Sequence, residues 1–234
     1  MKLSIHQPSY FPWLGLLHKI SQSDVYMVMD DVQLTDKAYQ HRNIFLTLDG
    51  KVKYLTIPFA KKSYLKKKIR DLKIYDSKWC CNHVNFLKNN YAKHRFYDEI
   101  FPYVEQFYLE EYEWLIDAIW GSMQLCLKLF DVKTQIVFQS EYITNEENQG
   151  GNLVLDLVQQ VGADCYISGL GAQAYLDDSL FNDLCKIEYS NFRHPHYSQK
   201  SSTEFVCGLS SLDVLFNLGV EKSQDLLKKD CVVC

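Results

Sequence analysis

Residues 5–31 read IHQPSYFPWLGLLHKISQSDVYMVMDD, and this stretch gives the strongest indication of the fold. Residues 3–6 have the character of a short strand, residues 13–21 repeat apolar side chains at helical spacing, and residues 25–29 form a continuous apolar run. Pro12 stands where the first turn of a helix tolerates proline. The stretch therefore predicts a compact β-α-β unit with two parallel strands.

The rest of the chain adds a hairpin, a helical region and further strands. Asp49-Gly50 lies between residues 44–48 and 52–57, which predicts an antiparallel hairpin with a type I′ turn. Residues 77–130 have a helical, aromatic-rich pattern, from which we expect three helices broken near Phe101-Pro102 and Glu110-Glu111. The other predicted elements are strands at 72–75, 134–138, 165–167 and 186–189, and helices at 153–161 and 211–218, closed by Gly162 and Gly219.

These elements predict one α/β domain over residues 1–225, since 234 residues suit a single hydrophobic core. Its sheet is expected to be mixed and largely parallel, of Rossmann-like type, with an antiparallel hairpin and a helical insertion at about 77–130. Residues 226–234 are expected to form a flexible tail.

Composition and charge exclude several classes of protein. A net charge of −4 and a pI near 6.0 give no general attraction for nucleic acid, so we expect no nucleic-acid partner. No apolar run approaches the roughly 18 residues of a membrane span, and the first residues do not resemble a signal peptide. The eight cysteines lack the spacing of a small disulfide framework, which fits reduced thiols and a cytoplasmic location.

Polar side chains follow three of the predicted strands, at residues 6–13, 30–31 and 168–171. Ligands of open parallel sheets bind beyond the carboxyl ends of the strands, so these segments are expected to face one crevice. His6 is the candidate catalytic acid or base, because imidazole titrates near neutral pH; the alternative is a strand-end histidine bonded to the backbone. Asp30 is slightly favoured over Asp31 as the group that orients His6 or binds a cation, and the alternative is a solvated turn.

The candidate substrate-binding residues are more scattered. Gln7 has the donors and acceptor to recognise a polar ligand, whereas Tyr10 and Trp13 either stack on a planar ligand or belong to the core. Lys37 and Arg42 suit a phosphate, with salt bridging as the alternative. The remaining candidates are His18, Asn43, Ser168, Gly169, His194, His196, Tyr197 and Gln199.

Several motifs are too incomplete to define a site. His194-Pro195-His196 lacks further ligands at convincing spacing, so no metal site is predicted. The basic stretch 61–70 is typical of a solvated face. Gly169-Leu170-Gly171 is shorter than a dinucleotide-binding fingerprint. Gly15 and His18 match the HxGH motif of nucleotidyltransferases only loosely, because its first histidine is missing.

The ordered set of motifs resembles the WbqC-like family. The residues that carry the resemblance are His6-Gln7-Pro8, Tyr10, Pro12-Trp13, Gly15, Lys19, Asp24, Asp30-Asp31-Val32-Gln33, Lys37, Arg42-Asn43, Tyr166-Ile167-Ser168-Gly169, His194-Pro195, Tyr197, Gln199, Ser211-Leu212-Asp213, Leu215-Phe216-Asn217 and Gly219. The resemblance implies a biological setting, since the family is associated with bacterial surface-polysaccharide gene clusters, including O-antigen loci. It implies a particular reaction less firmly. The aromatic helical stretch and the cysteine-ended tail match no motif of the family.

The leading hypothesis is a transferase that adds an acyl or aminoacyl group to a nucleotide-linked or lipid-linked amino sugar. One alternative is a nucleotidyltransferase that activates a sugar phosphate or a carboxylate, and only this alternative implies a cofactor, Mg²⁺ with a nucleoside triphosphate. A second alternative is a non-catalytic sugar-nucleotide binding protein. The expected partner is a small-molecule or carrier-linked sugar, and the sequence leaves the sugar, the donor and the oligomeric state open.

Overall fold

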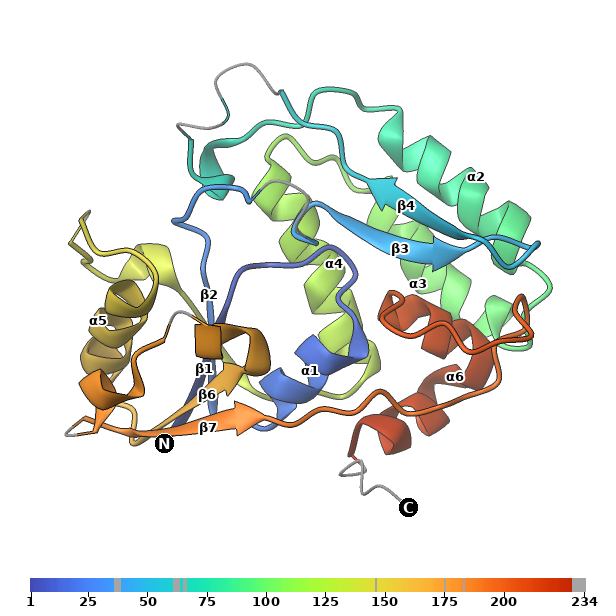
Figure 1. Ribbon diagram of the computed structural model, residues 1–234. Helices are drawn as coiled ribbons and strands as arrows, with labels where there is room; N and C mark the ends of the chain where they lie inside the picture. Colours follow the sequence, from blue (N-terminus) through green and yellow to red (C-terminus); the bar gives the residue numbers. More distant parts are fainter. Residues whose placement is uncertain are drawn as a thin grey trace.

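The computed structural model describes residues 1–35, 39–60, 64, 67–145, 147–174, 176–182 and 184–228. Its centre is a parallel sheet whose strands are β1 (Lys2–His6), β2 (Val25–Val28), β5 (Gln135–Phe138), β6 (Cys165–Gly169) and β7 (Lys186–Ser190), in the spatial order β5-β2-β1-β6-β7 (Figure 1). Numbered along the chain, these strands follow the order 3-2-1-4-5 of doubly wound folds. The prediction of a largely parallel, Rossmann-like sheet is confirmed.

Helices cover both faces of this sheet. Helix α1 (Leu14–Ser21) lies on one face and α5 (Gly151–Val161) on the other, as the nearly edge-on view in Figure 1 shows. Successive side chains of β2 point to opposite faces of the sheet and belong to two separate hydrophobic cores. Tyr26 packs on the α1 side and Met27 on the α5 side. Since both faces are buried, all four residues of β2 are buried, which explains its continuous apolar sequence.

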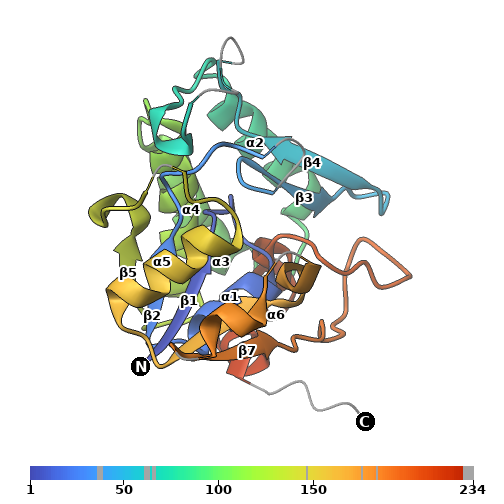
Figure 2. The same ribbon diagram turned by 60° about the vertical axis from the view of Figure 1, so that its left-hand side comes forward.

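The long connection from β2 to β5 contains the hairpin and the helical region. The elements are β3 (Arg42–Leu46), β4 (Val52–Thr56), α2 (Trp79–Tyr91), α3 (Tyr97–Leu109) and α4 (Leu115–Leu129). These helices share one hydrophobic core with α1 and with α6 (Ser211–Lys228), so they are packed into the domain (Figure 2). The short 3-10 helices are η2 (Ile69–Asp71), η3 (Gln139–Glu141), η4 (Leu170–Ala174) and η5 (Asp178–Phe181).

Three helices in the 77–130 region were predicted and are confirmed, but one predicted break is wrong. Pro102 lies inside α3, and the chain turns instead between Tyr91 and Tyr97. A proline inside a helix costs roughly 3 kcal/mol. Here α3 buries Phe101, Val104 and other side chains that gain about 1.5–3 kcal/mol each, so packing outweighs the proline.

Three other local predictions differ from the structure. The hairpin turn is not type I′, because among its residues only Gly50 has a positive φ, of 76°. Residues 72–75 form no strand, and Lys73 and Ile74 make only isolated bridges. Helix α6 kinks at Gly219, where φ is 79°, but continues to Lys228; it includes residues 226–228, and the rest of the predicted tail lies outside the described residues.

The α6 kink has a packing reason. A Cβ atom at Gly219 would lie 2.6 Å from the ring of Phe96, so a larger residue would have to displace that ring.

None of the helices in the described part of the chain has both the length and the apolar character needed to cross a bilayer.

Candidate functional site

The strand order has a switch point between β1 and β6. From β1 the chain continues to β2 and β5 on one side of the sheet, whereas β6 and β7 lie on the other side of β1. Doubly wound proteins bind ligands beyond the carboxyl ends of the strands at such a point. His6 ends β1 and Gly169 ends β6. Two cavities open here, and His6 lines both.

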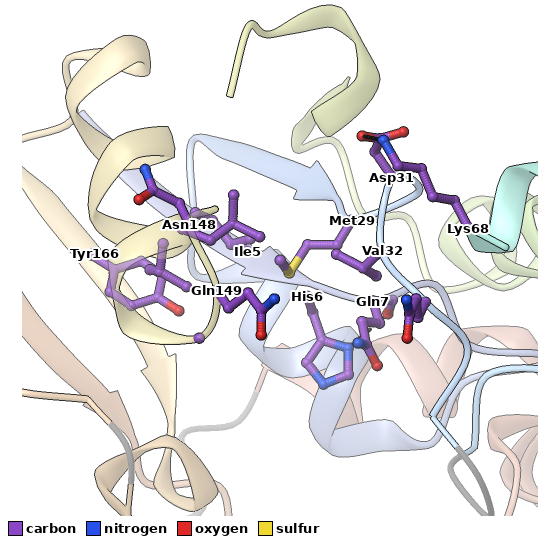
Figure 3. Close-up of a pocket in the computed structure, with 14 residues that line it drawn as sticks. Ile5, His6, Gln7, Met29, Asp31, Val32, Lys68, Asn148, Gln149 and Tyr166 are labelled. Carbon is purple, nitrogen blue, oxygen red and sulfur yellow. Dashed lines mark hydrogen bonds and ion pairs between the residues drawn. The ribbon is translucent and has the colours of Figure 1, made fainter. Parts of the chain in front are cut away.

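The larger one, the α5-side cavity, has a volume of about 560 Å³. Figure 3 shows the His6 imidazole and the Gln7 and Gln149 carboxamides pointing into the same open space. The other polar side chains that line it are Gln33, Asn148, Asp31, Lys68 and Tyr166. Half of its polar side chains are therefore carboxamides, each of which can donate and accept hydrogen bonds.

A hydrogen bond sets the tautomer of His6. Its Nδ1 atom lies 2.7 Å from the carbonyl oxygen of Gln7. Because a carbonyl only accepts, Nδ1 carries the proton, and in the neutral ring Nε2 keeps a free lone pair. Enclosure by the crevice lowers the pKa of His6 to about 3, and the Lys19 ammonium acts in the same direction. His6 is therefore neutral at pH 7, and its side chain remains exposed to the crevice.

A cluster of charges forms one edge of the α5-side cavity. Asp31 binds Lys68 at 2.6 Å through Oδ2 and Arg70 at 2.7 Å through Oδ1. Both cations also line an adjoining cavity of about 470 Å³. Two cations around one carboxylate leave a net positive charge, and both side chains are partly exposed, so an anionic group can reach them.

The second cavity that His6 lines, the α1-side cavity, has a volume of about 270 Å³. Trp13 and Phe192 contribute rings to it, and Gly169 and Gly171 contribute backbone. Lys19 is its charged residue, although only 5% of that residue is exposed. Burial lowers the pKa of Lys19 to about 7.

Asp30, slightly favoured over Asp31 from the sequence, has structural surroundings. Asp30 is buried, and its carboxylate accepts hydrogen bonds from the backbone N–H and the hydroxyl of Ser140, at 3.0 and 2.6 Å. It therefore anchors η3 to the end of β2, and neither cavity includes it. Asp31 instead lines the α5-side cavity.

Tyr10, Arg42 and Asn43 also have structural surroundings rather than a place in the two cavities. Tyr10 is fully buried, and its hydroxyl pairs with Tyr108 and, at 2.9 Å, with Nδ1 of His83. Asn43 donates to the carbonyl oxygens of Tyr10 and Phe11 at 3.1 and 2.6 Å. The Arg42 guanidinium lies over the ring of Tyr54 at 4.5 Å. Lys37 lies outside the described residues.

The predicted residues at 194–199 line neither of the two cavities that His6 lines. Tyr197 donates to the Asp213 carboxylate at 2.7 Å, and Gln199 donates to the carbonyl oxygen of Val206 at 2.8 Å. His194 and His196 pack against the ring of Phe205. Neither histidine lines the α5-side or the α1-side cavity, although the His194 ring lies 5.9 Å, between centroids, from Phe192, which lines the α1-side cavity.

The remaining predicted residues lie close to the crevice. Trp13 and Gly169 line the α1-side cavity, and His18 contacts the ring of Phe192, with 5.2 Å between centroids. Ser168 is fully buried, and its hydroxyl has no hydrogen-bond partner among the described residues. The described chain contains no group of three or more His, Cys, Asp or Glu side chains placed to hold a metal.

Comparison with known proteins gives the family. The model of the WbqC-like protein family matches residues 7–225. The chain belongs to the WbqC-like protein family. It is 28% identical over 224 residues to "Uncharacterized protein Rv1507c" of Mycobacterium tuberculosis (strain ATCC 25618 / H37Rv), and the match covers 94% of this chain and 95% of that protein. No solved structure matches the chain significantly.

Sequence reasoning did not select Gln149, Lys68, Arg70 or Lys19 as site residues. Lys19 carried a usable signal, because it is a lysine within the apolar face of a short helix. Gln149 follows β5 and precedes α5, so the strand-end rule also applied to it. Lys68 and Arg70 had no local signal beyond a basic stretch, since only the fold brings them to Asp31.

Proposed function

We propose that this WbqC-like protein is an enzyme of bacterial surface-polysaccharide synthesis that transfers an acyl or aminoacyl group to the amine of a nucleotide-linked or lipid-linked amino sugar. The observation that carries this proposal is the position of His6, a neutral imidazole at the switch point beside a cavity lined by carboxamides. The family resemblance supports the biological setting.

The α5-side cavity suits the sugar. Sugar hydroxyls both donate and accept hydrogen bonds, and Gln7, Gln149 and Asn148 can match either role. The volume of about 560 Å³ lies within the usual range for small-molecule sites. Lys68 and Arg70 at its edge would bind the phosphate of a nucleotide or lipid carrier, the role that sequence reasoning gave to Lys37 and Arg42.

The chemical role of His6 follows from its tautomer. Nδ1 is occupied by the Gln7 carbonyl, so Nε2 accepts the proton that the sugar amine loses as it attacks the acyl carbon. A general base of this kind contributes roughly 10²–10⁴-fold to a rate. His6→Ala is therefore expected to lower turnover by that factor while the fold remains intact.

The first test is a thermal-shift panel on native protein, His6→Ala and His196→Ala. The panel contains UDP-linked and dTDP-linked amino sugars, free nucleotides, and nucleoside triphosphates with Mg²⁺. His196 is a matched control because it is an exposed histidine outside both cavities. We expect amino-sugar nucleotides to stabilise all three proteins. In reaction mixtures that also contain an activated acyl or aminoacyl donor, mass spectrometry should detect acylated sugar with native protein and His196→Ala only.

Other outcomes separate the alternatives. Stabilisation only by a triphosphate with Mg²⁺, with release of pyrophosphate, would replace the proposal by the nucleotidyltransferase. Tight binding of a sugar nucleotide without turnover under any donor would favour a binding protein. Full activity of His6→Ala would remove His6 from the mechanism.

A further inference from the structure

The α1-side cavity has no role in holding the sugar, yet it shares His6 with the α5-side cavity. Its walls are mainly apolar: Trp13 lies edge-to-face with Phe192, with 5.5 Å between ring centroids. The Trp13 ring also covers Gly15, where a Cβ atom would collide with it. Trp13 is 38% exposed even so, and its free surface is available to an apolar ligand.

Two glycines leave space in this cavity. A Cβ atom built on Gly169 or on Gly171 would meet no described atom within 4 Å. Neither residue has the positive φ that would require glycine for the backbone. The space beside them is therefore open to a Cβ atom, and a larger residue at either position adds volume to the wall of the cavity.

Lys19 gives the cavity a positive group in an apolar setting. Its Nζ donates to the carbonyl oxygen of Ile5 at 3.0 Å, and no described carboxylate forms an ion pair with it. An ammonium has three donors, and this bond uses one. Burying a cation without an opposite charge is costly, so this placement is explained if an oxygen atom of a ligand gains negative charge beside it.

We propose that the α1-side cavity binds the acyl group of the donor, an activated acyl compound, with its carbonyl oxygen at Lys19 and its carbonyl carbon beside His6. This inference rests on the proposed function, because it assigns the second substrate of the same reaction. The sugar and the acyl group then approach His6 from opposite faces of the sheet.

The transfer step balances with these groups. The sugar nitrogen forms a bond to the acyl carbon and gives its proton to Nε2 of His6, while the Lys19 ammonium stabilises the negative charge on the carbonyl oxygen. The bond from the acyl carbon to its sulfur or phosphate oxygen then breaks, and the leaving group departs with the electron pair. The proton held by His6 goes to that leaving group or to solvent.

The size of the cavity limits the acyl group. Sites that enclose drug-sized ligands measure about 300–1,000 Å³. The α1-side cavity, at about 270 Å³, is smaller, so it accommodates a short chain or a single ring. The carrier of the acyl group would remain outside the cavity.

The test compares binding to two matched cavity variants by isothermal titration calorimetry. The probes are acetyl, butanoyl and benzoyl thioesters of coenzyme A, the corresponding acyl phosphates, free coenzyme A, and a UDP-linked amino sugar. Gly171→Val fills the α1-side cavity, with Gly169→Ala as a milder second variant, whereas Gln149→Ala removes a carboxamide from the α5-side cavity. Thermal melting confirms that each variant is folded.

We expect Gly171→Val to weaken binding of either the thioesters or the acyl phosphates at least tenfold. Its affinity for the UDP-linked amino sugar should stay within twofold of that of native protein. Gln149→Ala should do the reverse. Whichever probe class binds identifies the source of the acyl group. The inference is overturned if acyl compounds bind native protein no better than free coenzyme A or phosphate, or bind Gly171→Val as tightly as native. If native protein does not bind the UDP-linked amino sugar at all, the proposed function is overturned instead.

Discussion

The Nζ atom of Lys19 lies 3.0 Å from the carbonyl oxygen of Ile5, the residue that precedes His6. This contact fixes an ammonium close to the imidazole, and their mutual repulsion contributes to the lowered pKa of His6. The two groups therefore do not carry positive charge together near pH 7. In the proposed reaction one is a base and the other a proton-bearing electrophile.

Replacing Lys19 with methionine is expected to stabilise the protein and to impair its reaction. Met keeps the length of the side chain and removes the cost of burying a charge, so the free energy of unfolding should rise on the order of 1 kcal/mol. Acyl transfer should fall at least tenfold, because the carbonyl oxygen loses its positive partner. Urea unfolding and a transfer assay measure the two effects, and a less stable but fully active variant would contradict both.

The same variant has a distinct pH dependence. Burial lowers the pKa of Lys19 from 10.5 to about 7, so between these values the unfolded chain binds more protons than the native protein. This difference makes the contribution of Lys19 to stability increase from pH 7 to pH 10. The unfolding free energy of native protein minus that of Lys19→Met should therefore rise over this range; a constant difference would show that Lys19 titrates normally.

Asn43 is expected to matter for stability. It is 1% exposed and holds the carbonyl oxygens of Tyr10 and Phe11, the latter at a positive φ of 39°. Asn43→Ala leaves both acceptors without this donor and should cost about 2–4 kcal/mol in urea unfolding. Asn152→Ala, at an exposed position of α5, serves as the control and should change stability by less than about 0.5 kcal/mol.

Ser168 was predicted to bind the substrate, and substitution of this residue tests that prediction. Its buried hydroxyl has no hydrogen-bond partner in the described chain, so Ser168→Ala should leave the unfolding free energy unchanged or raise it by about 1 kcal/mol. The buried Ser122 is the matched contrast, because its hydroxyl bonds to Ile119 and Phe11, and Ser122→Ala should be destabilising. A loss of ligand affinity in Ser168→Ala with unchanged stability would return Ser168 to the site.

Asp213 gives a second pH effect. Burial raises the pKa of this carboxyl to about 6, although hydrogen bonds from Tyr197, Tyr91 and Asn217 oppose the shift. Between about pH 4 and pH 6 the native protein then binds more protons than the unfolded chain, so this residue makes stability fall as the pH rises. Asp213→Asn should remove that fall. Urea unfolding at pH 4, 5, 6 and 7 would refute the assignment if native protein and variant changed in parallel.

The predictions that succeeded depend on local patterns. The β-α-β unit, the hairpin and three helices follow from apolar spacing within short windows. The break at Pro102 was wrong, because burial against other helices overrides a local signal, and the helical residues that follow the predicted interruption at Gly219 were missed. Asn43, Tyr10 and Gln199 were selected for their chemistry, which buried structural side chains share with binding residues.

The family, the parallel sheet and the histidine at the end of its first strand can be predicted from the sequence, because periodicity and strand ends are properties of neighbouring residues. The tertiary structure is needed to place the polar groups around that histidine. It brought Gln149 and Lys68 to the cavity and left His194 outside it. These positions depend on how long crossover connections pack around the sheet, and that packing is set by contacts between residues far apart in the chain.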